Sequence, residues 1–232
     1  TLHYEAAVAG AIPIIRPLRE SLAGDRVTRV VGILNGTTNH ILTRMSEDGA
    51  DFDDVLADAQ AAGFAEADPS ADVDGHDAAA KTAILATLAY GAAVHDADVH
   101  REGIRGITAA DLRVAARLGY VIKLLGIANE VDGRVGVRVH PAMLPADHPL
   151  ASVRGVYNAV YVEAEATGPL MFYGRGAGAM PTGAAVVGDL VVTARDVVRG
   201  ASAGEEADPG PAEIRSIDEL RTQYCVRLEV DD

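Results

Sequence analysis

Residues 59–81 read AQAAGFAEADPSADVDGHDAAAK, and this stretch contains an acidic loop followed by the start of a buried helix. Acidic side chains, Pro69 and Gly75 fill residues 64–75, so no helix is expected there before His76. From His76 the chain is apolar on nearly every face through residue 94, which is typical of a helix buried in a core. We therefore expect the fold to form around this helix.

The sequence on either side of this helix indicates an α+β domain, with a mixed or antiparallel sheet whose helices cover one face. Residues 27–34 are β-branched and apolar, and they lead through an NGTTN turn into a helix with Thr37 or Thr38 as its cap. Asp132-Gly133 is a strong hairpin signal. Further strands are expected at residues 2–9, 121–130, 134–140, 156–163, 170–173 and 225–230. Further helices are expected at residues 17–24, 53–62, 109–119 and 184–199, and Thr108 is the expected cap of the third of them.

The composition excludes several classes of partner. The 232 residues include 34 Asp and Glu against 20 Lys and Arg, a formal net charge of -14, which repels nucleic acid phosphates and anionic lipid surfaces. No apolar run reaches the roughly 20 residues of a membrane-spanning helix. The single Cys225 favours a reducing compartment. We therefore expect no nucleic acid partner, no membrane and a cytoplasmic location.

Asp77 and Lys81 form the first candidate for chemistry. They stand four residues apart, so on a helix they share one face. A lysine held beside a carboxylate in this way is a candidate proton donor to a carbonyl oxygen. By spacing alone, however, a solvated acid–base pair beside an acidic loop is the simpler interpretation.

The longer pattern favours the chemical interpretation. The run A-x3-G-F-A-x2-D-P-x2-D-V-x-G-x-D-x3-K resembles the signature of the homoserine dehydrogenases position for position, and the resemblance extends from Tyr4 to about Gly200. It implies the reversible reduction of L-aspartate 4-semialdehyde to L-homoserine, with hydride exchanged with NADP or NAD. It also implies the catalytic domain fold of that family with remnants of a Rossmann-type domain, and a homodimer or higher homo-oligomer. Phe64 departs from the pattern, because many members have Tyr there.

The resemblance also implies roles for individual residues of this run. Lys81 corresponds to the proton donor to the aldehyde oxygen. Glu66 and Asp77 correspond to the substrate-binding carboxylates, with Asp72 in support, and a carboxylate suits the ammonium group of homoserine. Gly63 corresponds to a position where the backbone lies against the cofactor.

Residues 4–13, YEAAVAGAIP, place one carboxylate before a stretch of small residues. Taken alone, this is a strand that ends in a turn. A hard cation, however, binds one carboxylate together with several backbone carbonyls. The stretch resembles the family's E-x2-V-x-G-x-I segment, which implies a sodium site formed by Glu5 and the main chain of Val8, Gly10 and Ile12.

Two further turns also match the homoserine dehydrogenase pattern. Helix capping explains the NGTTN run at residues 35–39 almost as well as ligand binding does, but the resemblance implies that Gly36 and Thr37 lie near the substrate. Residues 174–183, GRGAGAMPTG, lack the usual dinucleotide fingerprint. They resemble the family's GxGAGxxPT segment, which implies that Gly178 approaches the nicotinamide.

The resemblance divides the chain into five parts. These are the end of the dinucleotide-binding domain and hinge (1–12), a catalytic, substrate-binding and dimerisation domain (13–178), a helix that returns to the dinucleotide-binding domain (179–200), a linker (201–222) and the start of an ACT-type regulatory domain (223–232). Most of the dinucleotide-binding domain is expected before Thr1, so the chain by itself is expected to be inactive. The alternatives are a substrate-binding and dimerisation module without catalysis, or a related amino-acid dehydrogenase.

Overall fold

Six strands form one sheet, in the order β2-β4-β3-β1-β5-β6, in the computed structural model, which describes residues 2–200 and 209–226. The strands are β1 (Val27–Ile33), β2 (His100–Arg101), β3 (Tyr120–Val131), β4 (Arg134–Pro145), β5 (Tyr157–Ala164) and β6 (Gly168–Arg175). The short β2 runs parallel to β4, and the other pairings are antiparallel. The expected mixed sheet is therefore confirmed. The expected hairpin is also present, because Asp132 and Gly133 take the positive φ values that a tight turn between β3 and β4 requires.

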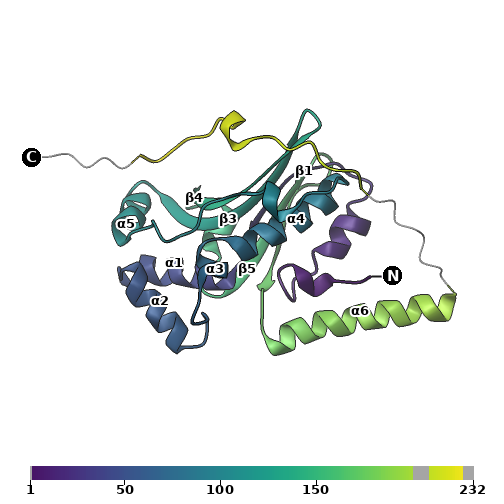
Figure 1. Cartoon of the computed structure of the whole chain (residues 1–232), viewed down its shortest axis with the longest axis horizontal. Coiled ribbons are helices and arrows are strands. Elements are labelled where there is room, and N and C mark those ends of the chain that lie inside the picture. Colours follow the sequence, from purple (N-terminus) through teal and green to yellow (C-terminus); the bar gives the residue numbers. More distant parts are fainter. Residues whose placement is uncertain (1, 201–208, 227–232) are drawn as a thin grey trace, which may run out of the picture.

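The helix α4 (His76–Tyr90) is the central element that packs on this sheet. Figure 1 shows α4 crossing one face of the sheet, with the other sheet-covering helices beside it. Its buried side chains are mostly alanines, which let the helix approach the strands closely. The approach leaves no room for a side chain at Gly126 of β3, where a Cβ would lie 2.2 Å from Oγ1 of Thr82. The expected buried helix is confirmed, and it ends at Tyr90, with Gly91 as its C-terminal cap, rather than at residue 94.

Side chains alternate between the two faces of the sheet, and each face contributes to its own apolar cluster. On the helix side, Val30, Leu124 and Val160 belong to the main core. On the opposite side, Val31 and Leu125 belong to a second cluster that residues of the short 3-10 helix Pro149–Ser152 help to cover. The α-helices that pack on the sheet therefore lie on one face, as the sequence indicated.

The remaining helices are α1 (Gly36–Asp48), α2 (Phe52–Ala61), α3 (Ser70–Val73), α5 (Ala109–Arg117) and α6 (Ala179–Arg199). Three details correct the sequence-based expectations. The cap of α1 is Asn35 rather than Thr37 or Thr38, because its Oδ1 accepts a hydrogen bond from the backbone N–H of Thr38 at 2.8 Å. One helical turn, α3, forms inside the acidic loop, where no helix was expected. The helix α6 begins at Ala179, five residues before the start at residue 184 that the amphipathic pattern indicated and at the start that the family resemblance implied.

The N-terminal segment also differs from expectation. Residues 2–9 were expected to form a strand, but Glu5–Ala7 form a 3-10 helix. The physical reason is the buried carboxylate of Glu5, which accepts hydrogen bonds from the backbone N–H groups of Ile14, Ile15 and Arg16 and so folds the segment back on itself. A positive φ at Gly10 completes the reversal.

Two segments extend from this body. The helix α6 stands away from the sheet (Figure 1) and exposes apolar side chains, including Met180 and Leu190, which are 84% and 63% exposed. Residues 209–219 belong to the expected linker, yet they pack against the sheet. The backbone of Glu213 and Arg215 is hydrogen-bonded to Val135 of β4, and Arg134 pairs with Glu219. The expected strand at residues 225–230 falls mostly outside the described residues.

The described helices include none that is long and apolar enough to cross a membrane.

A lysine, Lys123, lies buried at the beginning of β3 and is only 3% exposed. Its ammonium donates hydrogen bonds to Oδ1 of Asn39 on α1 and to the carbonyl of Val153. Burial, together with the positive charge of the nearby Arg154, lowers the pKa of Lys123 from 10.5 to about 8. Burial of the protonated Lys123 therefore costs desolvation free energy in the folded state.

We predict that the stability of the chain rises between about pH 8 and pH 10.5. In that window the unfolded lysine binds a proton that the folded one releases, so the free energy of unfolding increases with pH by at most about 3 kcal/mol. Urea unfolding of the wild type and of Lys123→Met at several pH values measures this. The Met variant should lose the increase, and an equal slope in both proteins would contradict the prediction.

Candidate active site

The first turns of α4 hold the acid–base pair that the sequence indicated. Nζ of Lys81 lies 2.7 Å from Oδ2 of Asp77 and donates a second hydrogen bond to the carbonyl of Leu34 at 3.1 Å. Their side chains are 20% and 33% exposed, so the pair lies at the protein surface but is partly shielded from solvent. A lysine ammonium has three protons. Within the described residues these two oxygens are its acceptors, which leaves one proton for a ligand.

Asn35 connects this pair to the acidic loop. Its Nδ2 donates to Oδ1 of Asp72 at 2.6 Å and to Oδ2 of Asp77 at 3.0 Å, while its Oδ1 caps α1. One carboxamide therefore joins α1 and α4 to the carboxylate of Asp72 on α3. The family resemblance did not point to this residue, because it implied only Gly36 and Thr37 of the same turn. An asparagine directly before a helix start was the available signal.

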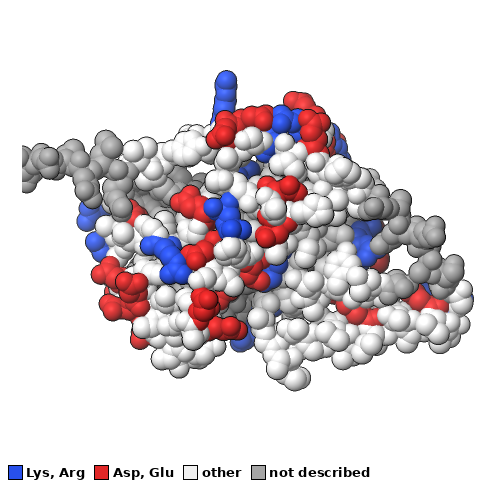
Figure 2. Space-filling model, in the orientation of Figure 1, with Lys and Arg blue, Asp and Glu red and all other residues white. Residues whose placement is uncertain are grey.

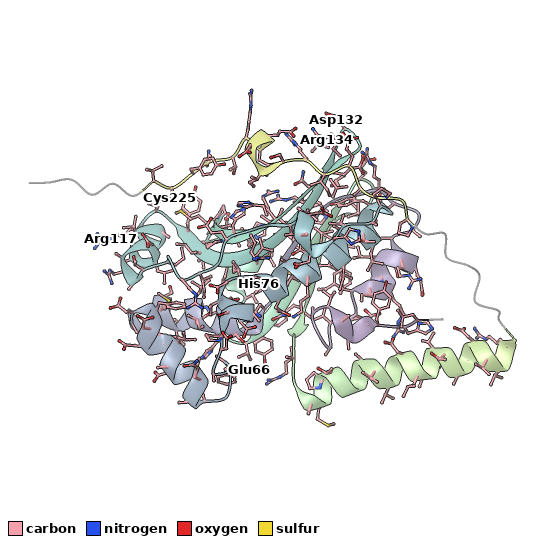
Figure 3. The ribbon with its side chains drawn as sticks, viewed as in Figure 1. Glu66, His76, Arg117, Asp132, Arg134 and Cys225 are labelled. Atoms are coloured by element: carbon pink, nitrogen blue, oxygen red, sulfur yellow. The ribbon has the colours of Figure 1, made fainter. Side chains whose placement is uncertain are left out.

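The loop after α2 carries Glu66 and lies beside the same turn. Oγ1 of Thr37 donates to the carbonyl of Phe64 at 2.9 Å, which fixes the loop against α1. Glu66 is exposed, and Gln60 holds its backbone carbonyl at 2.9 Å. Figure 3 shows Glu66 at the lower edge of the molecule, below His76 at the start of α4. No ion pair among the described residues joins the carboxylate of Glu66 to Lys81, so the structure gathers Asp72, Asp77 and Lys81 but leaves Glu66 apart.

The aromatic ring of Phe64 contacts a second residue of α1. Its centroid lies 4.9 Å from that of His40, and burial together with the nearby Arg44 lowers the pKa of His40. The half-exposed Phe64 thus forms an apolar wall beside Thr37. Because Phe has no hydroxyl, this wall offers no polar group to a ligand.

Two exposed glycines were expected to contact a cofactor. Gly63 follows the end of α2, and no atom lies within 4 Å of the place where its Cβ would be. Gly178 directly precedes α6, where a Cβ would lie 3.2 Å from Pro181. The open space beside Gly63 leaves its backbone accessible to a ligand, and the backbone at Gly178 is exposed as well.

The expected cation site has a different environment from the one the sequence suggested. Besides the three backbone N–H groups, the carboxylate of Glu5 accepts a hydrogen bond from Nε of Arg16 at 3.2 Å. Arg16 in turn pairs with Asp189 of α6, whose carboxylate also accepts from the backbone N–H of Glu5. In the described part of the chain, no group of three or more His, Cys, Asp or Glu side chains is placed to hold a metal ion. The sodium site stays a prediction.

Acidic side chains gather near the site on the visible face of the molecule. Figure 2 shows carboxylates over α2 and the acidic loop, with a few Arg and Lys side chains among them, whereas α6 is largely uncharged. This surface favours a ligand that carries a cationic group.

Comparison with known proteins identifies the family. A family model of homoserine dehydrogenase matches residues 13–191 of the chain. This chain belongs to the homoserine dehydrogenase family. It is 56% identical over 236 residues to a homoserine dehydrogenase of Mycobacterium leprae, in a match that covers all of this chain and 54% of that protein. The chain therefore spans about half the length of the curated homoserine dehydrogenases that it matches most extensively.

Solved structures of homoserine dehydrogenases have the same fold. The crystal structure of one from Thiobacillus denitrificans superposes with a TM-score of 0.83 at 45% identity, covering 95% of this chain and 50% of that one. A hyperthermophilic archaeal homoserine dehydrogenase mutant in complex with NADPH superposes with a TM-score of 0.71 at 33% identity, covering 83% and 55%. The family and fold expected from residues 59–81 are confirmed.

We predict that Asn35→Ala destabilises this homoserine dehydrogenase family member by about 1–3 kcal/mol, because it removes a helix cap together with the donor shared by Asp72 and Asp77. The matched control is Thr108→Ala, which removes the cap of α5, where Thr108 exchanges hydrogen bonds with Asp111, and should cost about 1 kcal/mol. Urea unfolding measures both. Equal losses would mean that the hydrogen bonds to the two carboxylates contribute nothing.

Proposed function

We propose that this chain is the catalytic and substrate-binding part of an NADP- or NAD-dependent homoserine dehydrogenase, which interconverts L-homoserine and L-aspartate 4-semialdehyde. The observation that carries the proposal is the position of the Lys81 ammonium, whose nitrogen lies 2.7 Å from Asp77. Asp77 and the carbonyl of Leu34 accept two of its three protons, and the third is available to a substrate. Family membership, and the NADPH bound to one solved relative, support the reaction class and the cofactor.

The proton transfer follows from this arrangement. In the reduction, Lys81 donates its proton to the aldehyde oxygen as the carbonyl carbon receives a hydride, so the product is the neutral alcohol. In the oxidation, neutral Lys81 accepts the proton of the hydroxyl group. The carboxylate of Asp77 and the carbonyl of Leu34 hold the nitrogen in place in both directions. When bound, the nicotinamide supplies or accepts the hydride.

The carboxylates recognise the other end of the substrate. Asp72 and Asp77 lie together because they share the amide of Asn35, and Glu66 lies on the exposed loop nearby. We infer that these acids pair with the α-ammonium group of the substrate, with Gly36 and Thr37 alongside, and that Glu66 joins them when the substrate binds. The accessible backbone at Gly63 and Gly178 fits a dinucleotide, which needs close approach to main chain without side chains in the way.

Self-association belongs to the same proposal. The face of the sheet opposite α4 carries the second apolar cluster, and Tyr173 is exposed on it while stacking on Tyr157 at 5.2 Å. We infer that this face pairs across a homodimer. Sedimentation of the chain measures the assembly.

We predict that Lys81→Ala lowers kcat by about 10²- to 10⁴-fold. In the test, this chain replaces the matching 236 residues within the M. leprae homoserine dehydrogenase, and the reduction of NADP by L-homoserine is followed. Lys81→Arg is the matched variant, because arginine keeps the pairing with Asp77 but does not give up its proton. It should retain the fold and lose turnover.

Two results would contradict this proposal. Near-normal turnover in Lys81→Arg would remove Lys81 as the proton donor. An unsubstituted protein that binds L-homoserine without oxidising it would favour the alternative, a substrate-binding and dimerisation module.

The cation is a separate proposal. We propose that sodium is held by the backbone carbonyls of Val8, Gly10 and Ile12 rather than by Glu5, because the carboxylate of Glu5 already accepts four hydrogen bonds. We predict that Glu5→Ala lowers the free energy of unfolding by about 2–5 kcal/mol equally in sodium and in potassium buffers, since it leaves buried N–H groups without acceptors. A loss confined to sodium buffer would show that Glu5 itself is a ligand.

A further inference from the structure

Asn158 lies at the junction of the two glycine-containing turns of the proposed site. It is the second residue of β5, it is 1% exposed, and it pairs with Gly174 of β6. Its Oδ1 is buried and has no hydrogen-bond partner among the described residues. A buried acceptor without a donor is costly, and an apolar side chain of the same size would avoid that cost.

The surroundings of Asn158 are packed so closely that no side chain fits on either side. A Cβ at Gly176 would lie 2.2 Å from Cγ and Nδ2 of Asn158. A Cβ at Gly36 would lie 2.8 Å from the carbonyl oxygen of Val156, which closes that side, and in ordinary contact with Oδ1 of Asn158 at 3.5 Å. One layer further out, a Cβ at Gly10 would lie 2.2 Å from the carbonyl of Gly176. We call Gly10, Gly176, Asn158 and Gly36 the junction column.

The junction column links three parts of the proposed site. Gly36 belongs to the turn whose Leu34 carbonyl holds Lys81 and whose Asn35 holds the two aspartates. Gly176 lies two residues before Gly178, and Gly10 belongs to the segment that Glu5 folds back. A change in the thickness of this column therefore changes the distance between residues 174–178 and the proton donor.

We propose that Asn158 is a positioning residue for the dehydrogenase reaction, which sets the separation between the turn at Gly36 and the loop at residues 176–178. Its Oδ1 receives a hydrogen bond from a backbone N–H of that loop when the cofactor is bound. This inference rests on the proposed function, in which the loop borders the nicotinamide. It explains why a polar side chain without a partner occupies a buried position in the free chain.

The test uses Asn158→Leu, which keeps the size of the side chain and removes the unpaired oxygen. The melting temperature of the chain alone should stay the same or rise. In the chain exchanged into the M. leprae enzyme, KM for NADP should rise about tenfold, which corresponds to about 1.4 kcal/mol, and kcat should fall. The matched control is Asn129→Leu, because the amide oxygen of Asn129 already accepts from Arg138. It should lower the melting temperature and leave KM for NADP unchanged.

A double-mutant cycle provides the second readout. Gly176→Ala places a methyl group against Asn158 and should raise KM for NADP, whereas in an Asn158→Ala background the same change should cost at least threefold less, because the clashing amide is gone. Additive effects would overturn the proposal.

The remaining outcomes are also decisive. A lower melting temperature of Asn158→Leu with unchanged KM and kcat would show that Asn158 has only a structural role. Unchanged melting temperature, KM and kcat would also overturn the inference. In both cases the proposed function would stand, provided that the unsubstituted protein oxidises L-homoserine. A parent that fails to oxidise L-homoserine would contradict the proposed function and this inference together.

Discussion

The amide of Asn35 is the interaction on which the candidate site depends. Its oxygen caps α1, and its nitrogen donates to Asp72 and Asp77, which lie on two other helical segments. Asp77 in turn holds Lys81. Two carboxylates close to one another repel, and a shared donor together with one ammonium reduces that repulsion. Lys81 and the two aspartates are thus fixed by hydrogen bonds to one another and to Asn35 rather than by packing alone.

The sheet supplies the rigid support for this arrangement. The turn that carries Asn35 follows directly after β1, the strand that pairs with both β3 and β5 at the middle of the sheet. The helix α4 is pressed against β3 through Thr82 and Gly126, so the end of β1 and the start of α4 meet at a defined distance. Side chains held in this way lose little conformational freedom when a ligand binds.

Buried charge marks a second region, where the N-terminal segment meets α6. Glu5, Arg16 and Asp189 form a chain of ion pairs and hydrogen bonds between elements far apart in sequence. Glu5 is buried, so removing its partners would leave a desolvated carboxylate without compensating hydrogen bonds, which costs more than the pairs contribute. This network orients α6, and α6 begins directly after the loop at residues 174–178.

Local patterns in the sequence determined the main elements, the family and the pair of Asp77 and Lys81. The buried helix, the Asp132-Gly133 hairpin and the Thr108 cap follow from hydrophobic periodicity and turn chemistry, which act between near neighbours in the chain. The strand expected at residues 2–9 failed because the partners of Glu5 lie nine to eleven residues away. Only the tertiary structure showed that Asn35 joins Asp72 to Asp77 and that Asn158 separates Gly36 from Gly176. Those contacts span 18 to 122 residues of sequence, and no local pattern encodes a distance across a folded sheet.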